Sequence, residues 1–164
     1  MNTYENLKSK PWWTYLEEDL RELISESFVL SSDADGWEYK FHDYSFVVFP
    51  AAKAYEGFLK KMFIDLEFIT SDDYYGSRFR IGRALNPSVE RKNGEENVYD
   101  KIVKYCVGGK ELADKLWVTW KDARNTIFHW FPDEKRAITL AEAKIKLTEI
   151  IDAIGEAYGE LLRS

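Results

Sequence analysis

One short segment of the sequence, residues 124–129 (RNTIFH), combines side chains that are suited to work on a phosphodiester. The guanidinium of Arg124 is a planar fork of donors that stays charged and holds a phosphate through two contacts. His129 carries an imidazole, the side chain that general acid–base catalysis uses most often. Asn125 stands where it can orient that imidazole or bond a ribose. Arg124, Asn125 and His129 are therefore the candidate catalytic residues.

On an ideal helix Asn125 and His129 share a face, whereas Arg124 and His129 lie roughly 140° apart. One straight helix does not aim both groups at one atom, but a two-fold dimer or a distorted helix end would do so.

A structural interpretation of this segment remains open beside the catalytic one. Basic side chains near the C-terminus of a helix commonly interact with the helix dipole and have no catalytic role. The helical spacing of Trp117, Trp120 and Trp130 favours core or dimer contacts over stacking on bases. His42 is expected in a turn or at the surface, and Cys106, in an apolar pattern, is expected to be a small buried side chain.

Composition limits the classes of function. The 164 residues carry a formal net charge of −6, which argues against a general nucleic-acid binder and confines any contact with RNA to a local basic patch. Arg80 and Arg83 are the candidates for that patch, and the alternative is two surface arginines in a loop. With two histidines, one cysteine and no zinc-hydrolase motif, glycine-rich phosphate loop or nucleophile elbow, no metal and no cofactor is expected.

Neither a leader peptide nor a membrane-spanning segment is expected. Its N-terminus lacks a basic stretch followed by an apolar one, and the longest apolar run, near residues 46–52, is too short to span a bilayer. We therefore expect a single soluble, cytoplasmic domain over residues 1–164. Residues 1–45 are either part of that common domain or an added N-terminal helix and loop.

The elements that position these side chains are expected to be helices. Residues 31–43 are expected to be a loop with room for a short strand pair, and residues 70–94 a loop with one helical turn near Arg80–Leu85. Pro50 either starts its helix or kinks it. The pattern predicts an all-α, up-and-down bundle of four to five helices. Apolar spacing and capping signals predict these helices over Trp12–Phe28, Phe46–Phe68, Asn97–Val107, Glu111–His129 and Thr139–Tyr158.

The stretch 116–129 (LWVTWKDARNTIFH), followed by a short loop and a Thr-Leu-x-Glu-Ala helix, resembles the HEPN superfamily and, within it, the branch of RNase LS-type toxins. Segments 49–59 (FPAAKAYEGFL) and 80–87 (RIGRALNP) are similar to the same branch. The resemblance covers about Phe46 to Tyr158. The signature of this family is an arginine that is followed by a polar residue and then, after four to six positions, by a histidine.

The resemblance implies a HEPN-like bundle that dimerises so that both Arg-His motifs line one cleft, where RNA is cleaved without a metal. Attack by the 2′-hydroxyl of the RNA would leave a 2′,3′-cyclic phosphate, and it needs a group for the 2′ proton, donors for the phosphoryl oxygens and help for the leaving oxygen. Arg124, Asn125 and His129 would supply these groups. The resemblance also implies that the second helix lies near this cleft. Glu56 would then pair with Arg124, and Lys53 would contact phosphate. The alternative for Lys53 and Glu56 is a plain solvated salt bridge.

The function expected from the sequence is that of a metal-independent endoribonuclease with RNA as substrate. It would act as a homodimer and as the toxin of a toxin–antitoxin or antiviral defence system, with an antitoxin protein as partner. One alternative is a non-catalytic HEPN-like module that engages a nucleotidyltransferase, an antitoxin or a nucleic acid. Another is a helical subunit of a larger complex.

Overall fold

The computed structural model describes residues 4–91, 94–130, 132 and 136–162, and within these ranges the regular structure is helical, without a strand. Among these residues, 3₁₀ turns lie at Pro11–Trp13 and Ala34–Gly36, and π-helical turns follow α7 and α8 at Lys121–Asn125 and Tyr158–Leu162. The all-α prediction is thereby confirmed. The α-helices are α1 (Tyr4–Lys8), α2 (Glu18–Asp33), α3 (Ser45–Asp65), α4 (Ser71–Tyr75), α5 (Ile81–Leu85), α6 (Val98–Tyr105), α7 (Gly109–Trp120) and α8 (Leu140–Ala157).

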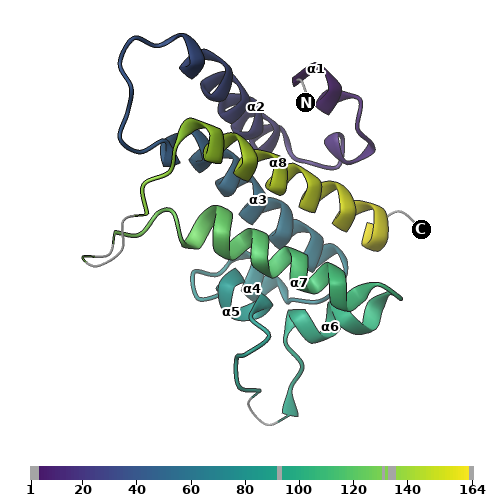
Figure 1. Cartoon of the computed structure of the whole chain (residues 1–164). Coiled ribbons are helices and arrows are strands. Elements are labelled where there is room, and N and C mark those ends of the chain that lie inside the picture. Colours follow the sequence, from purple (N-terminus) through teal and green to yellow (C-terminus); the bar gives the residue numbers. More distant parts are fainter. Residues whose placement is uncertain (1–3, 92–93, 131, 133–135, 163–164) are drawn as a thin grey trace.

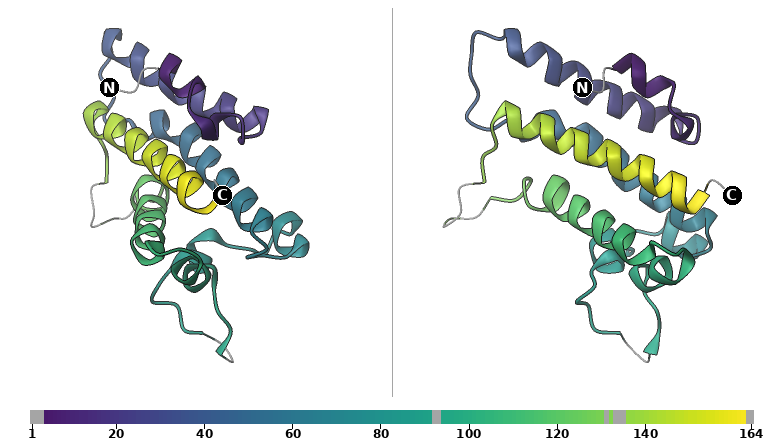
Figure 2. Two further views of the ribbon diagram at one scale, coloured as in Figure 1. Left: turned by 90° about the vertical axis from the view of Figure 1, so that its right-hand side faces the viewer. Right: turned by 45° about the vertical axis from the view of Figure 1, so that its right-hand side comes forward.

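The four longest helices, α2, α3, α7 and α8, run side by side and alternate in direction (Figure 1, Figure 2). Helix α3 packs against α2 and α8, and α7 packs against α8 and α6. The short helices α4 and α5 connect α3 to α6 at the edge of the bundle that α7 forms (Figure 1). The arrangement is the up-and-down bundle that apolar spacing predicts.

Helix α3 carries the centre of the core. The side chains of Tyr55, Phe58, Leu59 and Phe63 are fully buried, and the Tyr55 hydroxyl donates to the Leu116 carbonyl of α7 at 3.2 Å. Burial strongly raises the pKa of Tyr55, so this hydroxyl remains a neutral donor. These contacts tie α3 to α7, the two helices that flank the candidate site.

Pro50 lies inside α3 and does not start it. A proline has no N–H and its ring disturbs the preceding turn of a helix, which leaves backbone groups without their usual partners. The next N–H, that of Ala51, donates to the hydroxyl of Ser27 at 2.8 Å, and Ser27 on α2 is fully buried. A serine in the core of α2 therefore completes the hydrogen bonding of α3 beside the proline.

Two of the expected helices differ from the structure by more than three residues at an end. The segment predicted as one helix over Trp12–Phe28 forms the Pro11–Trp13 turn and then α2, and the described residues 31–43 contain no strand pair. The prediction of one helix over Glu111–His129 is wrong for its C-terminal end, because α7 ends at Trp120. A π turn over Lys121–Asn125 follows, in which the Thr126 N–H donates to the Lys121 carbonyl at 2.8 Å.

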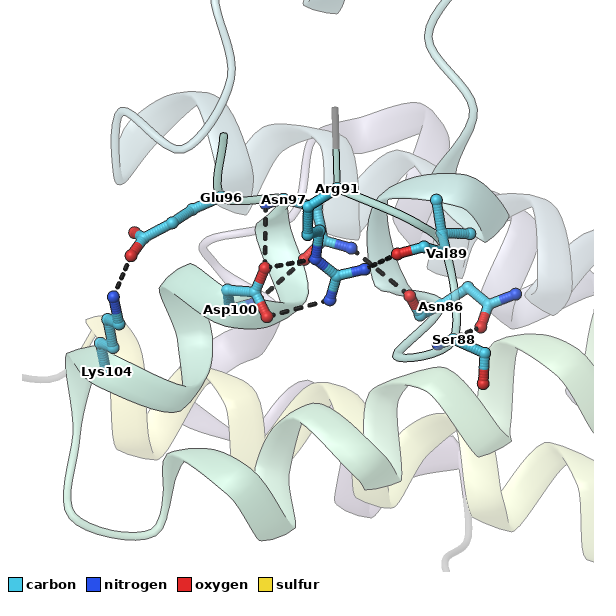
Figure 3. Close-up of polar contacts among 8 residues, drawn as sticks. All are labelled: Asn86, Ser88, Val89, Arg91, Glu96, Asn97, Asp100 and Lys104. Carbon is cyan, nitrogen blue, oxygen red and sulfur yellow. Dashed lines mark hydrogen bonds and ion pairs between the residues drawn. The ribbon is translucent and has the colours of Figure 1, made fainter. Parts of the chain in front are cut away.

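A network of polar side chains holds the segment after α5 against α6 (Figure 3). The Arg91 guanidinium makes two contacts with the Asp100 carboxylate, from Nε at 2.6 Å and from Nη2 at 2.9 Å. Asp100 and Asn97 form the capping box of α6, and the Asn97 amide also donates to the Asn86 carbonyl at 3.4 Å. The network fixes the C-terminal end of the segment that carries Arg80 and Arg83.

The Asp100→Asn variant is expected to lose stability in a pH-dependent way. The Arg91 guanidinium holds the pKa of Asp100 below its usual range. A carboxyl group with a lowered folded-state pKa stabilises the protein above its unfolded pKa, about 3.9, and the stabilisation disappears as pH falls through the folded value. Urea unfolding should show a loss of about 1–2 kcal/mol at pH 7 and a much smaller difference near pH 3. Asp152→Asn, on the exposed face of α8, is the control.

Candidate active site

The π turn after α7 holds Arg124 in a defined orientation. Its Nη2 donates to Oε2 of Glu56 on α3 at 2.9 Å, and both side chains are about one third exposed (37% and 31%). The guanidinium also lies over the Trp120 ring, 5.4 Å from its centroid. The ion pair with Glu56 that the family resemblance implied is therefore present. Since one nitrogen of the fork serves Glu56, the remaining donors stay available at the surface.

Arg124 and Asn125 open into a hollow of about 640 Å³ between α3, α7 and the segment that contains α5. Helix α5 packs against α7 at this place (Figure 1). Arg80 and Arg83, far from Arg124 in the sequence, line the same hollow. We call it the positive hollow; its charged, amide and tryptophan lining is Glu56, Lys60, Arg80, Arg83, Asn86, Trp117, Trp120, Arg124 and Asn125.

The positive hollow is cationic, although the protein as a whole carries a net negative charge. Four cationic side chains line it, and the carboxylate of Glu56 is paired with Arg124. The whole chain has a formal net charge of −6. An acidic protein with one local cationic hollow repels nucleic acid over most of its surface and attracts it at that place. Such a site suits a ligand with phosphate groups.

A second hollow, of about 510 Å³, shares Arg80 and Arg83 with the first. Its described lining carries as many carboxylates as cations, among them Asp73, Glu90 and Lys101. The Lys101 ammonium donates to the Phe68 carbonyl at 2.8 Å, so one of its N–H donors is used in a hydrogen bond within the protein. The balanced charge makes this hollow a poorer site for a polyanion.

His129 and Lys53 do not line the positive hollow. The backbone leaves the π turn, makes a turn at residues 126–128, and places His129 beyond any helix with its side chain exposed. The expectation that Asn125 and His129 share one helical face is therefore wrong. The reason is the π turn and the helix end that follows it. Phe128, the neighbour of His129, packs on Phe49 of α3 with ring centroids 5.3 Å apart.

Lys53 lies on the exposed side of α3 between these two regions. It stands four residues after Phe49 and three before Glu56, so the three side chains share one helical face. That face leads from the Phe49–Phe128 contact, next to His129, to the Glu56–Arg124 pair. The predicted site residues thus lie along one side of the molecule, although only part of them meet in one hollow.

Residues 13–84 match the family model described as RnaseLS-like HEPN. Over these residues the match confirms the resemblance to the RNase LS branch of the HEPN superfamily. The matched HEPN segment begins at Trp13, earlier than the resemblance indicated, and ends at Ala84. It includes α2, α3, Glu56, Arg80 and Arg83, and it ends before Arg124 and His129. No curated protein and no solved structure matches the chain.

Some residues of the positive hollow were not among the expected ones. Lys60 lies four residues after Glu56, so helical spacing along α3 would have found it. The sequence predicts Trp117 and Trp120 in the core or at a dimer contact, and both also reach the hollow. Asn86 follows α5, and no pattern in the neighbouring sequence predicts that it lines the hollow.

The part of the chain that the structure describes contains neither a metal-binding cluster nor a membrane-spanning helix. No three or more His, Cys, Asp or Glu side chains among these residues gather where they could hold a metal ion. Among the described helices, none combines the length and the apolar character that crossing a membrane requires.

Proposed function

We propose that the protein is a metal-independent endoribonuclease and that the positive hollow holds the RNA backbone beside the bond that is cleaved. The observation that carries the proposal is that Arg124, fixed by Glu56, opens with Asn125 into the same hollow as Arg80 and Arg83. The match of residues 13–84 to a ribonuclease-like family supports the same conclusion. Arg124, Asn125 and His129 are the proposed catalytic residues, and Lys53, Glu56, Arg80 and Arg83 the accessory ones.

The proposed reaction is attack of a ribose 2′-oxygen on the adjacent phosphorus. A bond forms between the 2′-oxygen and phosphorus, the bond to the 5′-oxygen breaks, and a 2′,3′-cyclic phosphate remains. An imidazole takes the 2′ proton and an imidazolium supplies one to the leaving oxygen. Arg124 stabilises the charge on the two non-bridging oxygens through the donors that Glu56 does not occupy.

A homodimer would supply the histidine that the positive hollow of one chain lacks. His129 stands outside that hollow, and aromatic side chains near it are exposed, with 54% of Phe49 and 84% of Trp130 accessible. Exposed apolar side chains next to a functional residue favour an interface. We propose that two copies meet along this side, so that the imidazoles and guanidiniums of both chains act at one cleft.

The same proposal includes the biological role. The protein would act as a toxin, and an antitoxin protein would inhibit it.

The decisive test is cleavage of RNA by the purified protein in EDTA. Wild-type protein is expected to leave cyclic-phosphate ends, which are identified by mass spectrometry. His129→Ala is expected to lose about 10²–10⁴-fold in rate, the usual contribution of a general acid–base, with an unchanged circular dichroism spectrum. His42→Ala controls for the loss of an imidazole. RNA binding without any turnover in the wild type would favour the non-catalytic binding module instead.

A further inference from the structure

Trp117 is an aromatic ring that reaches the positive hollow from α7 and is only partly buried. Its ring lies nearly parallel to that of Trp120, at 13° and with centroids 6.0 Å apart. Arg124 lies over Trp120 in turn. The three side chains stand at spacings of three and four residues, so they form one column along α7 and the π turn. The wall of the hollow therefore combines a partly open aromatic ring with a cation that can hold phosphate.

Trp120 is the fixed base of this column. It is 8% exposed, and Gly82 of α5 packs so closely on it that a Cβ atom would lie 2.4 Å from Cη2 of the ring. Its Nε1 is buried and has no hydrogen-bond partner among the described residues. A buried donor without an acceptor costs stability, so core stability alone does not explain an indole at this position. Held in this way, Trp120 supports the ring of Trp117 from one side.

The chemistry around Trp117 is that of a nucleotide site. Lys60, Arg80 and Arg83 supply charge for phosphate groups, and the amides of Asn86 and Asn125 supply donors and acceptors for a ribose or a base edge. Aromatic side chains in such cationic grooves stack on nucleobases, because every base has a π face. Bases inside a duplex are already stacked and paired, so that face is available only in unpaired RNA.

We propose that Trp117 is a stacking platform for an unpaired base, so that the positive hollow takes single-stranded RNA in preference to duplex. This inference rests on the proposed function, since it assigns a subsite beside the phosphate that Arg124 holds. Trp117 acts in binding and has no part in proton transfer.

The platform can be tested by binding without cleavage. The probes are a uridine oligonucleotide that is 2′-O-methylated throughout, the matched abasic oligonucleotide, and the uridine oligonucleotide annealed to its complement. Wild-type protein should bind the single-stranded uridine oligonucleotide at least about tenfold more tightly than the abasic one, as stacking of one base predicts. It should bind the duplex more weakly than the single strand.

Trp117→Leu, which keeps apolar bulk without a π face, should lose most of that preference while binding the abasic oligonucleotide as the wild type does. Trp117→Phe should retain most of it. Val118→Ala, an exposed neighbour on α7, is the matched control. Thermal melts show whether each variant is folded, and Trp117→Met, which also lacks a π face, takes the place of Trp117→Leu if that variant is not.

The outcomes separate the platform from the proposed function. A wild type that binds neither oligonucleotide would overturn both. Tight binding by the wild type without a preference for bases or for the single strand would overturn the platform alone. Equal losses for the uridine and abasic oligonucleotides in Trp117→Leu would assign Trp117 a purely structural role and would also overturn it.

Discussion

Arg124→Ala is expected to slow RNA cleavage by about 10²–10³-fold, the usual cost of removing one donor that stabilises charge in a transition state. The Glu56 carboxylate holds one end of the guanidinium at 2.9 Å, and the Trp120 ring lies beneath it. These contacts position the fork before RNA arrives, so little reorganisation is needed when charge develops on the phosphoryl oxygens. The measurement is the single-turnover rate on a labelled RNA in EDTA.

Two further variants distinguish a catalytic role of Arg124 from a structural one. Arg124→Lys keeps the charge but loses the two-point geometry, so its rate should lie between those of the wild type and Arg124→Ala. Glu56→Gln should lower the rate without preventing RNA binding, because it removes a positioning contact and leaves the cation in place. Arg21→Ala on α2 is the control for loss of an arginine. An Arg124→Ala variant that is folded and cleaves RNA at the wild-type rate would exclude the proposed mechanism.

The helices were predictable because their signals are local. The capping box of α8 is visible in the sequence as Thr139 followed by Glu142 at the third position, and the structure contains both of its hydrogen bonds. The apolar face of α3 likewise recurs at helical spacing. Such signals depend on neighbours within one or two helical turns, so they can be recognised in the sequence without knowledge of the rest of the fold.

The geometry of the candidate site depends on contacts that such local patterns do not contain. The π turn at Lys121–Asn125 follows α7 without a proline or glycine to mark the change. Arg80 and Arg83 meet Arg124 because α5 packs on α7. The absence of a side chain at Gly82 permits that approach, since a Cβ atom there would lie 2.4 Å from the Trp120 ring. The sequence therefore indicated which side chains were suited to the chemistry, whereas packing decided that Arg80 and Arg83 share a hollow with Arg124 and that His129 does not.

The double variant Arg80→Glu/Arg83→Glu is expected to weaken RNA binding by on the order of 10- to 100-fold at low salt, since it removes two cations that bind phosphate and adds repulsion. Both side chains line the positive hollow together with Arg124 and Asn125. For single-stranded RNA, the dependence of the logarithm of affinity on the logarithm of salt concentration should become shallower by about 1.4, or about 0.7 for each phosphate that is no longer neutralised. Titrations at several salt concentrations measure both quantities.

The salt dependence also separates a local effect from that of total charge. Lys144→Glu/Lys146→Glu on α8 changes the net charge by the same amount, and these two residues lie outside the positive hollow. Long-range repulsion is screened over a Debye length of about 10 Å at 0.1 M salt, so the control should approach wild-type affinity as salt rises. If the arginine pair and the lysine pair shift affinity equally at every salt concentration, the RNA does not pass through the positive hollow, and the site must be sought elsewhere on the surface.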